Sequence, residues 1–365
     1  MSNSFGSRGF GSRLTRRSFL SAAAGIGALT LAACGGAAGA SSASADSATS
    51  GADASSAASS VAPTKVSFVL DYAPNVNHTG LYVALDKGYF DEAGIELEIL
   101  PVPEDGSDML IGSGGADMGV TYQDYIANSL SSANPMPYTA IAALVQHNTS
   151  GIMSRKEDGI TTAKAMEGHV YATWNLPIEQ ATIKQVVEAD GGDFSKVEMV
   201  PYAVDDEVMG LKANMFDAVW VYEWWAVQNA KIQDYPVNYF SFKDMDPVFD
   251  FYTPVVAAND DFLAKHPETA RAVLVALRKG YEFAAEHPAE AAQILCAAVP
   301  ELDPSLVDAA QTAISPQYIA DAPRWGDIDP KRWARFYQWL NDKGLAENPI
   351  KTDAGYTLEY LDSAE

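Results

Sequence analysis

The sequence predicts an α/β protein built as two lobes. Strand-like and helix-like segments alternate along the body of the chain, a pattern typical of α/β folds with largely parallel sheets. The roughly 300 residues that follow an N-terminal export segment exceed what one hydrophobic core usually serves. In addition, 116-ADMGVTYQDY-125 and 216-FDAVWVYEWW-225 share one order of residue types: Asp, a short strand, then aromatic and polar residues. Two lobes of related topology are therefore expected.

The individual elements follow from residue period and from helix boundary signals. In one predicted strand, Ile95, Leu97 and Ile99 alternate with glutamates, so that strand is half-buried. Pro177 opens a helix, and Gly191-Gly192 ends it. The predicted strands are 66–70, 95–99, 117–120, 169–172, 197–201, 218–221 and 251–257. The predicted helices are 80–87, 108–111, 177–189 and most of the chain after residue 260.

The N-terminus carries two export signals. Thr15-Arg16-Arg17-Ser18-Phe19-Leu20 is a twin-arginine motif, and a weakly apolar run that follows it ends in Leu31-Ala32-Ala33-Cys34. That run is too short and too rich in Gly and Ala for a membrane span. Leu-Ala-Ala-Cys resembles the lipobox of bacterial lipoproteins, which predicts a signal peptide over 1–33 and lipidation of Cys34. The alternative is an ordinary signal peptide followed by a chance cysteine.

Residues 34–63 are mostly Gly, Ala and Ser, a composition that cannot bury a core and that indicates a flexible tether. Such a tether spans roughly 30 Å on average. We therefore expect an exported protein whose body stays close to the outer face of the cell membrane, held there by its lipid anchor alone.

Charge and cysteine content exclude several functions. The chain has a net charge of −24, and loss of the four arginines within 1–33 would give −28 (−24 − 4). A body this acidic argues against nucleic acid or anionic lipid as a partner. Cys34 and Cys296 are the only cysteines, and no zinc spacing, nucleotide loop or nucleophile motif is found. The sequence predicts no metal, no cofactor and no enzymatic activity.

The carboxyl ends of strands in α/β sheets are where ligands bind. Four predicted strand ends carry aromatic rings, and two of these also carry a carboxylate, a set that suits a planar heteroaromatic with an amino group. No Lys or Arg occurs at these ends, which disfavours anions, although helix N-termini can partly substitute. The candidate ligand-binding residues are Asp71, Tyr72, Asn75, His78, Tyr122, Trp174, Glu179, Tyr222, Glu223 and Trp224.

Each of these residues also has a purely structural interpretation. Asp71 could cap the Pro74-Asn75 turn, and His78 could cap the helix that follows. Tyr222 and Trp224 could be core or lobe-interface aromatics. Glu223 is harder to explain in this way, because an acid within VWVYEWWAV is costly to bury without a donor.

Several long motifs resemble the binding proteins of ABC importers for thiamine pyrimidine precursors: LDYAPNVNHTGLYVALDKGYFDEAGIELEI, IGSGGADMGV, DAVWVYE and WGDIDPKRWARFYQWLNDKGL. The resemblance implies a type II periplasmic-binding-protein fold with a ligand cleft between two lobes, which we assign to 64–158 plus 252–365 and to 159–251. It also implies a monomer that delivers a hydroxymethyl- or formylamino-pyrimidine to an ABC permease and its ATPase. Asp71, Asn75 and Glu223 would then bond the ring nitrogens and amine, and the tyrosines and Trp174 would sandwich the ring.

Three alternatives stay open. Related importers for riboflavin share the opening motif, so a flavin is possible, and a receptor that presents its ligand to a sensor is another. The same family contains a pyrimidine synthase, but that enzyme has a Lys and a His where this chain has Thr121 and Tyr125, and it carries a cysteine-rich motif that this chain lacks. Without the amine there is no Schiff base to pyridoxal phosphate.

Overall fold

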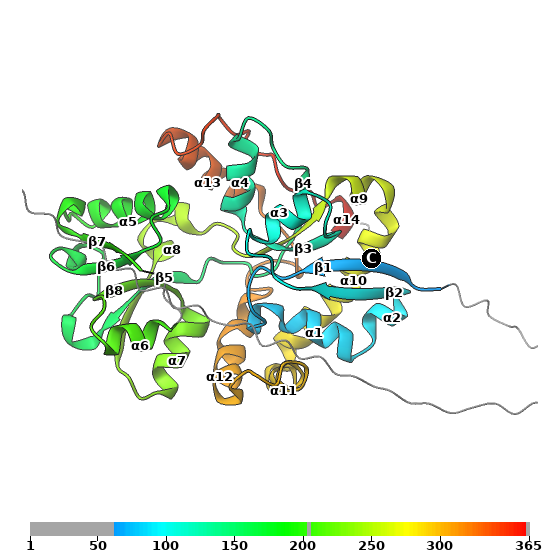
Figure 1. The fold of residues 1–365 in the computed structure, drawn as a ribbon, viewed down its shortest axis with the longest axis horizontal. Coiled ribbons are helices and arrows are strands. Elements are labelled where there is room, and N and C mark those ends of the chain that lie inside the picture. The colour runs from blue at the N-terminus through cyan, green and yellow to red at the C-terminus, as the bar shows by residue number, and fades with distance from the viewer. Residues whose placement is uncertain (1–61, 203–205, 363–365) are drawn as a thin grey trace, which may run out of the picture. The chain divides into compact units, whose positions relative to one another are not determined.

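The computed structural model describes residues 62–202 and 206–362. The predicted signal peptide, Cys34 and nearly all of the predicted tether lie outside the described residues. The strands form two five-stranded sheets, with the orders β2-β1-β3-β10-β4 and β7-β6-β8-β5-β9 (Figure 1). Their bounds are β1 Thr64–Val69, β2 Ile95–Leu100, β3 Met118–Thr121, β4 Tyr138–Ala143, β5 Ser150–Arg155, β6 Val170–Thr173, β7 Glu198–Pro201, β8 Ala218–Tyr222, β9 Val237–Ser241 and β10 Val255–Asn259.

The two sheets share one topology. In the first, β1 pairs in parallel with β2 and β3, whereas β10 runs antiparallel to β3 and β4. In the second, β6 pairs in parallel with β7 and β8, whereas β5 runs antiparallel to β8 and β9. The stretches 116–125 and 216–225 thus contain the central strands β3 and β8 of the two sheets. The antiparallel strand is β10 in the first sheet and β5 in the second. Each is the first strand that the chain forms after it crosses from one sheet to the other.

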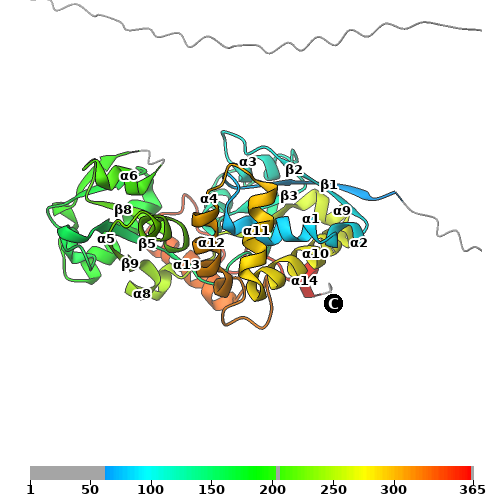
Figure 2. The same ribbon diagram turned by 90° about the horizontal axis from the view of Figure 1, so that it is seen from below.

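Helices pack on both sheets. In the first lobe, α1, α10, α11 and α12 contact one another and share a hydrophobic cluster with β1 and β3 (Figure 2). In the second, α5 and α6 lie on opposite sides of the sheet in Figure 1. The α-helices are α1 Thr79–Asp86, α2 Tyr89–Glu92, α3 Ser107–Gly112, α4 Gln123–Ser131, α5 Pro177–Ala189, α6 Glu207–Lys212, α7 Gln228–Ile232, α8 Phe242–Met245, α9 Asp260–Lys265, α10 Pro267–Glu286, α11 Pro288–Ala298, α12 Pro304–Ile314, α13 Pro330–Asp342 and α14 Glu359–Asp362.

The chain crosses between the sheets twice, through residues 144–149 and 242–254. Strand β5 pairs with β8 and β9, so the first crossing comes before it. The predicted first-lobe segment 64–158 therefore includes β5, which the structure places in the second sheet. Because β5 is buried along its whole length and shows no alternation of buried and exposed residues, its sequence does not indicate which sheet it joins.

The lobes also share buried contacts beyond the two crossings. One hydrophobic cluster contains residues of both sheets together with Trp333, Phe336 and Trp339 of α13. The indole N–H of Trp339 donates to Oε1 of Gln185 on α5, at 3.1 Å. Helix α13 of the first lobe thus contacts the second lobe directly.

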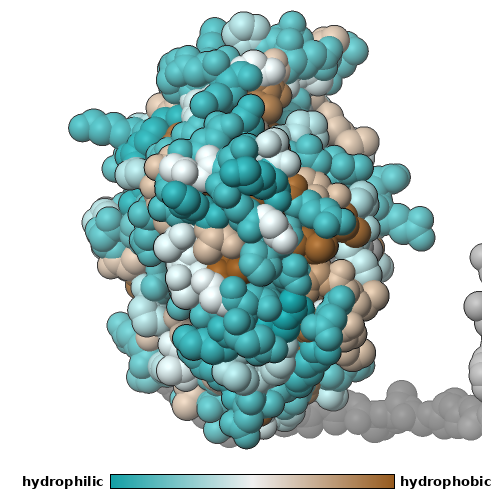
Figure 3. Space-filling model, turned by 90° about the vertical axis from the view of Figure 1, so that its left-hand side faces the viewer, coloured by the Kyte–Doolittle hydropathy of each residue, from teal (hydrophilic) through white to brown (hydrophobic). Residues whose placement is uncertain are grey.

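The side of the molecule shown in Figure 3 is mostly hydrophilic, with small separate hydrophobic areas. The large exposed apolar side chains of the second lobe include Trp174, Leu176, Met209, Met215 and Ile232. Within residues 62–202 and 206–362, no helix is both long and apolar enough to cross a bilayer.

Candidate functional site

The carboxyl ends of the central strands of both sheets lie close to each other. The hydroxyl of Tyr222, at the end of β8, is 3.2 Å from Oγ1 of Thr253 on the second crossing. Burial raises the pKa of Tyr222 above its ordinary value, and the carboxylates of Asp124 and Asp71 in the first lobe add to the rise. Asp71 of the first lobe and Tyr222 of the second lobe, both candidate ligand-binding residues, therefore lie near each other.

Asp71 lies after β1, and its side chain is only 3% exposed. Its Oδ1 is 2.7 Å from Nε2 of His78, and its Oδ2 accepts the hydroxyl hydrogen of Tyr122. Burial by itself would raise the pKa of Asp71, but the bonds from His78 and Tyr122 outweigh it and lower the pKa. Asp71 is thus an ionised, buried acid that holds two neighbouring side chains. The predicted direct bond from Asp71 to a ligand is not supported by this arrangement.

Asn75 and His78 are also occupied. The side chain of Asn75 accepts the backbone N–H of Asn77 at 2.8 Å and donates to the carbonyl of Ala73 at 3.0 Å, so it caps the short helix Val76–His78. His78 is fully buried, and its Nδ1 accepts the backbone N–H of Asn75 at 3.2 Å. Both side chains are thus committed to the turn around the short helix Val76–His78, whereas His78 makes no side-chain cap bond to the helix that follows.

Glu179 organises the loop after β6. This carboxylate is 3% exposed. Its Oε1 accepts from the hydroxyl of Tyr171 at 2.7 Å and from the backbone N–H of Trp174 at 3.1 Å. Its Oε2 accepts from the hydroxyl of Thr173 at 2.9 Å and from the N–H of Leu176 at 3.2 Å. The prediction that Glu179 contacts the ligand is therefore not supported; it fixes the backbone that carries Trp174.

Two aromatic candidates remain accessible. Tyr72 is 63% exposed and Trp174 is 44% exposed. The Trp174 ring centroid is 5.5 Å from that of Trp220, whose ring lies 4.2 Å from Phe242. Trp174 thus presents a supported ring at the edge of the second lobe, as a stacking residue requires.

Glu223 follows β8 at the first position of a short π-helix, Glu223–Val227. Segments of this kind often occur at functional sites. The backbone N–H of Glu223 donates to the carbonyl of Thr149 at 3.0 Å, whereas its side chain is exposed. Within the part of the chain that the structure describes, that carboxylate has no hydrogen-bond or ion-pair partner. Glu223 is free to accept hydrogen bonds from a ligand.

Trp224 does not face this region as a ligand contact would. It is 5% exposed and belongs to the hydrophobic cluster of the first lobe, and its π-helix contacts α12. The alternative interpretation of Trp224 as a lobe-interface aromatic is the one that fits.

Asp124, on α4, is a residue that the sequence analysis overlooked. Burial raises its pKa to about 6, and the neighbouring charge of Asp108 adds to the rise. Among the described residues it has no ion-pair partner, and its charge reaches Tyr222 of the other lobe. The signal was present in the sequence, because Asp124 immediately follows Tyr122-Gln123 at a strand end, but its local pattern is that of an ordinary helix start.

The residues at the two positions that distinguish the synthase also have defined surroundings. Thr121 is fully buried at the end of β3, and its hydroxyl has no partner within the described chain. Tyr125 is partly exposed and makes an edge contact with the Tyr122 ring, with centroids 5.1 Å apart. Neither side chain is an amine or an imidazole.

Two surface cavities, of about 250 and 300 Å³, lie elsewhere, beside α9. They are lined by residues such as Asp117, Lys265 and His266, and by residues such as Thr139, Leu263 and Tyr360. No predicted ligand residue lines either cavity. Over residues 62–202 and 206–362, no group of three or more His, Cys, Asp and Glu side chains could hold a metal ion.

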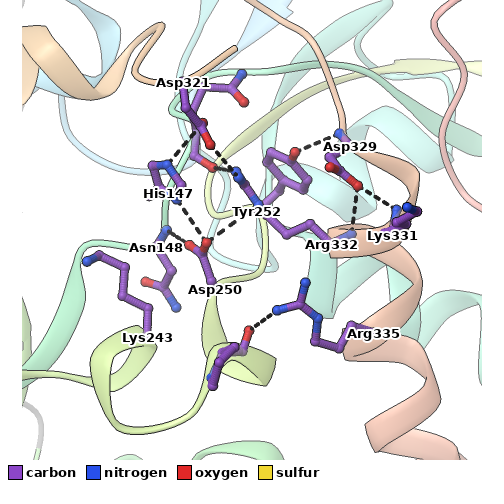
Figure 4. A network of polar contacts seen from close by, with 12 residues as sticks. His147, Asn148, Lys243, Asp250, Tyr252, Asp321, Asp329, Lys331, Arg332 and Arg335 are labelled. Atoms are coloured by element: carbon purple, nitrogen blue, oxygen red, sulfur yellow. Dashed lines mark hydrogen bonds and ion pairs between the residues drawn. The ribbon is translucent and has the colours of Figure 1, made fainter.

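A polar network joins the two crossings (Figure 4). His147 and Asn148 of the first crossing bond Asp250 of the second: Nδ1 of His147 is 2.8 Å from Oδ2, and the N–H of Asn148 donates to Oδ1 at 3.0 Å. Arg332 of α13 approaches Asp250 at 3.5 Å and Asp321 at 3.4 Å. His147 and Arg332 are thus paired with acids.

Two sheets of the same topology, joined by two crossings, define a two-lobed periplasmic-binding-protein fold, and solved structures agree. The alkanesulfonate-binding protein SsuA from Xanthomonas axonopodis pv. citri, bound to MOPS, matches with a TM-score of 0.62 at 10% identity, covering 81% of this chain and 99% of that one. SsuA from Escherichia coli matches with a TM-score of 0.63 at 11% identity, covering 80% and 97%. At these identities the similarity concerns the fold, and it confirms the predicted fold class.

The chain belongs to the NMT1/THI5-like family, whose model matches residues 75–291. A formylaminopyrimidine-binding protein of Halalkalibacterium halodurans is 24% identical over 301 residues, which cover 80% of this chain and 89% of that protein. The 4-amino-5-hydroxymethyl-2-methylpyrimidine phosphate synthase THI11 of Saccharomyces cerevisiae is 28% identical over 239 residues, which cover 62% of this chain and 69% of that enzyme. The family resemblance predicted from the motifs is confirmed.

Proposed function

We propose that this protein is the solute-binding component of an ABC importer and that it captures an aminopyrimidine precursor of thiamine, of the hydroxymethyl or formylamino type. The observation that carries the proposal is the free, exposed carboxylate of Glu223, which directly follows Tyr222 at the end of β8. A carboxylate without a protein donor suits the N–H groups of an aminopyrimidine. The formylaminopyrimidine-binding relative supports the same ligand class.

The proposed ligand contacts are Glu223 for the amine or ring nitrogen, and Tyr72, Tyr122, Trp174 and Tyr222 for the faces of the ring. Lipidation of Cys34, an exported location at the outer face of the membrane, a monomeric state and partnership with a permease and an ATPase are parts of the same proposal. They rest on the N-terminal motifs and on the resemblance.

A synthase function is the second candidate, because several family relatives carry that name. The buried hydroxyl of Thr121 and the phenol of Tyr125 argue against it, since neither can form a Schiff base or supply an imidazole. Riboflavin is the alternative ligand for a binding protein of this fold.

Mass spectrometry of the small molecule released by denaturing gently purified protein tests the proposal. An aminopyrimidine is the expected species, and calorimetric titration with that compound should then show binding. Release of riboflavin would select the alternative ligand. Formation of a pyrimidine during incubation with pyridoxal phosphate and iron would overturn the binding-protein assignment.

A further inference from the structure

A chain of hydrogen bonds runs from the backbone N–H of Asn75 through His78 and Asp71 to Tyr122. The Asn75 N–H determines where each hydrogen in this chain lies. The backbone N–H of Asn75 can only donate, so Nδ1 of His78, 3.2 Å away, must be the unprotonated nitrogen that accepts it. A neutral imidazole with a bare Nδ1 carries its hydrogen on Nε2. That Nε2–H points at Oδ1 of Asp71, at 2.7 Å. His78 is fully buried, which leaves it no water as another partner.

The same reasoning continues to Tyr122. Asp71 is ionised, because its bonds from His78 and Tyr122 hold its pKa below the ordinary value despite burial, so it can only accept. Burial and the neighbouring Asp71 charge raise the pKa of Tyr122 well above its usual range, so the phenol keeps its hydrogen. A phenol has one hydrogen, and Tyr122 donates it to Oδ2 of Asp71. The oxygen of Tyr122 is left with lone pairs only.

Tyr122 stands where a ligand would meet it. It directly follows β3, it is partly exposed, and Tyr222 of the second sheet is close enough to contribute to its pKa. Asp71, Asn75 and His78 are buried behind it. A group facing the Tyr122 oxygen must therefore bring a hydrogen of its own.

We propose that Tyr122 is the residue that selects an amino group over an oxo group on the ligand ring, and that Asp71 and His78 act through it as positioning residues. This inference rests on the proposed function. An exocyclic amine offers N–H to the Tyr122 oxygen, whereas a ring carbonyl would place two acceptors face to face, and a site left with such an unpaired contact rejects the ligand strongly.

The substitution Asp71→Asn should change the Tyr122 hydroxyl from a hydrogen-bond acceptor toward the ligand into a donor. The N–H of Asn75 still fixes His78, so Nε2–H of His78 bonds the oxygen of the introduced amide. The NH₂ of that amide then faces Tyr122 and donates to it. The hydroxyl hydrogen of Tyr122 is released and can be donated to a ligand carbonyl.

The test is calorimetric titration of two probes, 4-amino-5-hydroxymethyl-2-methylpyrimidine and its 4-oxo counterpart. Wild type should prefer the amino probe by at least about ten-fold, the size that one uncompensated hydrogen bond gives. Asp71→Asn should lower this preference at least about ten-fold, to parity or beyond. Tyr122→Phe should weaken amino-probe binding and strengthen oxo-probe binding, because the acceptor that opposes the ring carbonyl is removed. Tyr125→Phe is the matched control, because this neighbouring phenol does not bond Asp71, and its preference should be that of wild type.

The failures are distinguishable. If wild type binds neither these two probes nor their formylamino counterparts, the proposed function fails. If wild type binds the amino probe but Asp71→Asn keeps the wild-type preference, only this inference fails. Tyr122→Phe takes the place of Asp71→Asn in this comparison if Asp71→Asn does not fold. A second measurement needs no ligand. The ¹⁵N NMR spectrum of His78, assigned by comparison with His78→Gln, should show an unprotonated Nδ1 and a protonated Nε2. A protonated Nδ1 would overturn the inference.

Discussion

His147 and Asp250 connect the two crossings: Nδ1 of His147 lies 2.8 Å from Oδ2 of Asp250, and these residues stand on different segments between the sheets. The other ring nitrogen of His147 lies 3.1 Å from Asp321, so one imidazole contacts two carboxylates. The segments about which the lobes would move are thus bonded to each other and to the first lobe. This arrangement ties ligand exchange to the strength of a few side-chain bonds.

His147→Ala should therefore loosen the crossings. Because the ring is partly exposed, we expect a loss of about 1–2 kcal/mol in the free energy of unfolding. Ligand dissociation measured by stopped-flow fluorescence should become faster. His287→Ala, which removes an imidazole that is 53% exposed, is the control and should change neither quantity. Unchanged stability and dissociation in the His147 variant would show that the network does not restrain the lobes.

Glu223→Gln tests the ligand contact. The amide keeps the shape of the side chain, loses the charge and turns one acceptor into a donor that faces the ligand amine. Affinity for an aminopyrimidine that binds wild type should fall about ten- to a hundred-fold, because a charge-assisted hydrogen bond contributes roughly 1.5–3 kcal/mol. Thermal stability should stay nearly constant, since the wild-type carboxylate has no partner in the described chain. Glu198→Gln, on the exposed strand β7, is the matched control. An unaltered dissociation constant for Glu223→Gln would remove Glu223 from the site.

Glu179→Gln should act on the loop rather than on the ligand. The amide replaces one acceptor oxygen with a donor NH₂, which then faces one of the pairs of donors that the carboxylate now satisfies. We expect a loss of about 2–3 kcal/mol in unfolding free energy, the cost of unsatisfied buried donors. The fluorescence anisotropy of Trp174, isolated by comparison with Trp174→Phe, should decrease. Glu188→Gln, half-exposed on the same helix, should alter neither signal. Wild-type stability in the Glu179 variant would contradict the role assigned to its carboxylate.

Asp124 gives a prediction for pH dependence. Its pKa in the folded protein, about 6, is raised from 3.8 by burial first, so the folded state binds this proton more tightly than the unfolded state does. Stability therefore falls as pH rises from about 4 to about 6, and the group remains destabilising at pH 7. Asp124→Asn should stabilise the protein at pH 7 by about 1–2 kcal/mol, a value reduced for partial exposure, and should bring little change at pH 4. Chemical denaturation at both pH values measures these differences in unfolding free energy, and Asp244→Asn, at an exposed position, is the control. Equal effects of Asp124→Asn at pH 4 and pH 7 would refute the assignment.

Cys34→Ser tests the anchor. If Cys34 carries the lipid, the substituted protein should leave the membrane fraction and still bind its ligand, because the body of the chain is unchanged. Fractionation followed by immunoblotting measures the distribution. A variant that stays with the membranes would refute the lipoprotein assignment.

Local signals explain which elements could be predicted. The helix Pro177–Ala189 has the predicted bounds, because Pro177 fixes its first turn and a glycine pair follows it. Strands β4, β5 and β9 were missed. β4 and β5 are buried along nearly their whole length and include small residues such as Ala, Ser and Gly, so no alternation marks them as strands.

Local sequence could not predict which candidate side chains are already occupied within the chain, for a physical reason. Whether Asp71 is free or occupied depends on Tyr122, 51 residues away along the chain, which no local pattern reveals. Glu223 differs, because its prediction as a ligand-binding residue used only local sequence: an acid within an apolar run is costly to bury without a donor. The strand-end rule predicts a region, and long-range hydrogen bonds decide which of its side chains remain accessible.

The burial of Trp224 among the side chains of the first lobe has a mechanical consequence. The lobes touch on two faces, at Trp224 with α12 and at Trp339 with Gln185, so no rotation can part them without breaking at least one contact. Separating the lobes at Trp224 would expose a large apolar surface, and separating them at Trp339 would break into the hydrophobic cluster that α13 shares with both sheets. Buried apolar contacts on both faces therefore oppose separation of the two lobes.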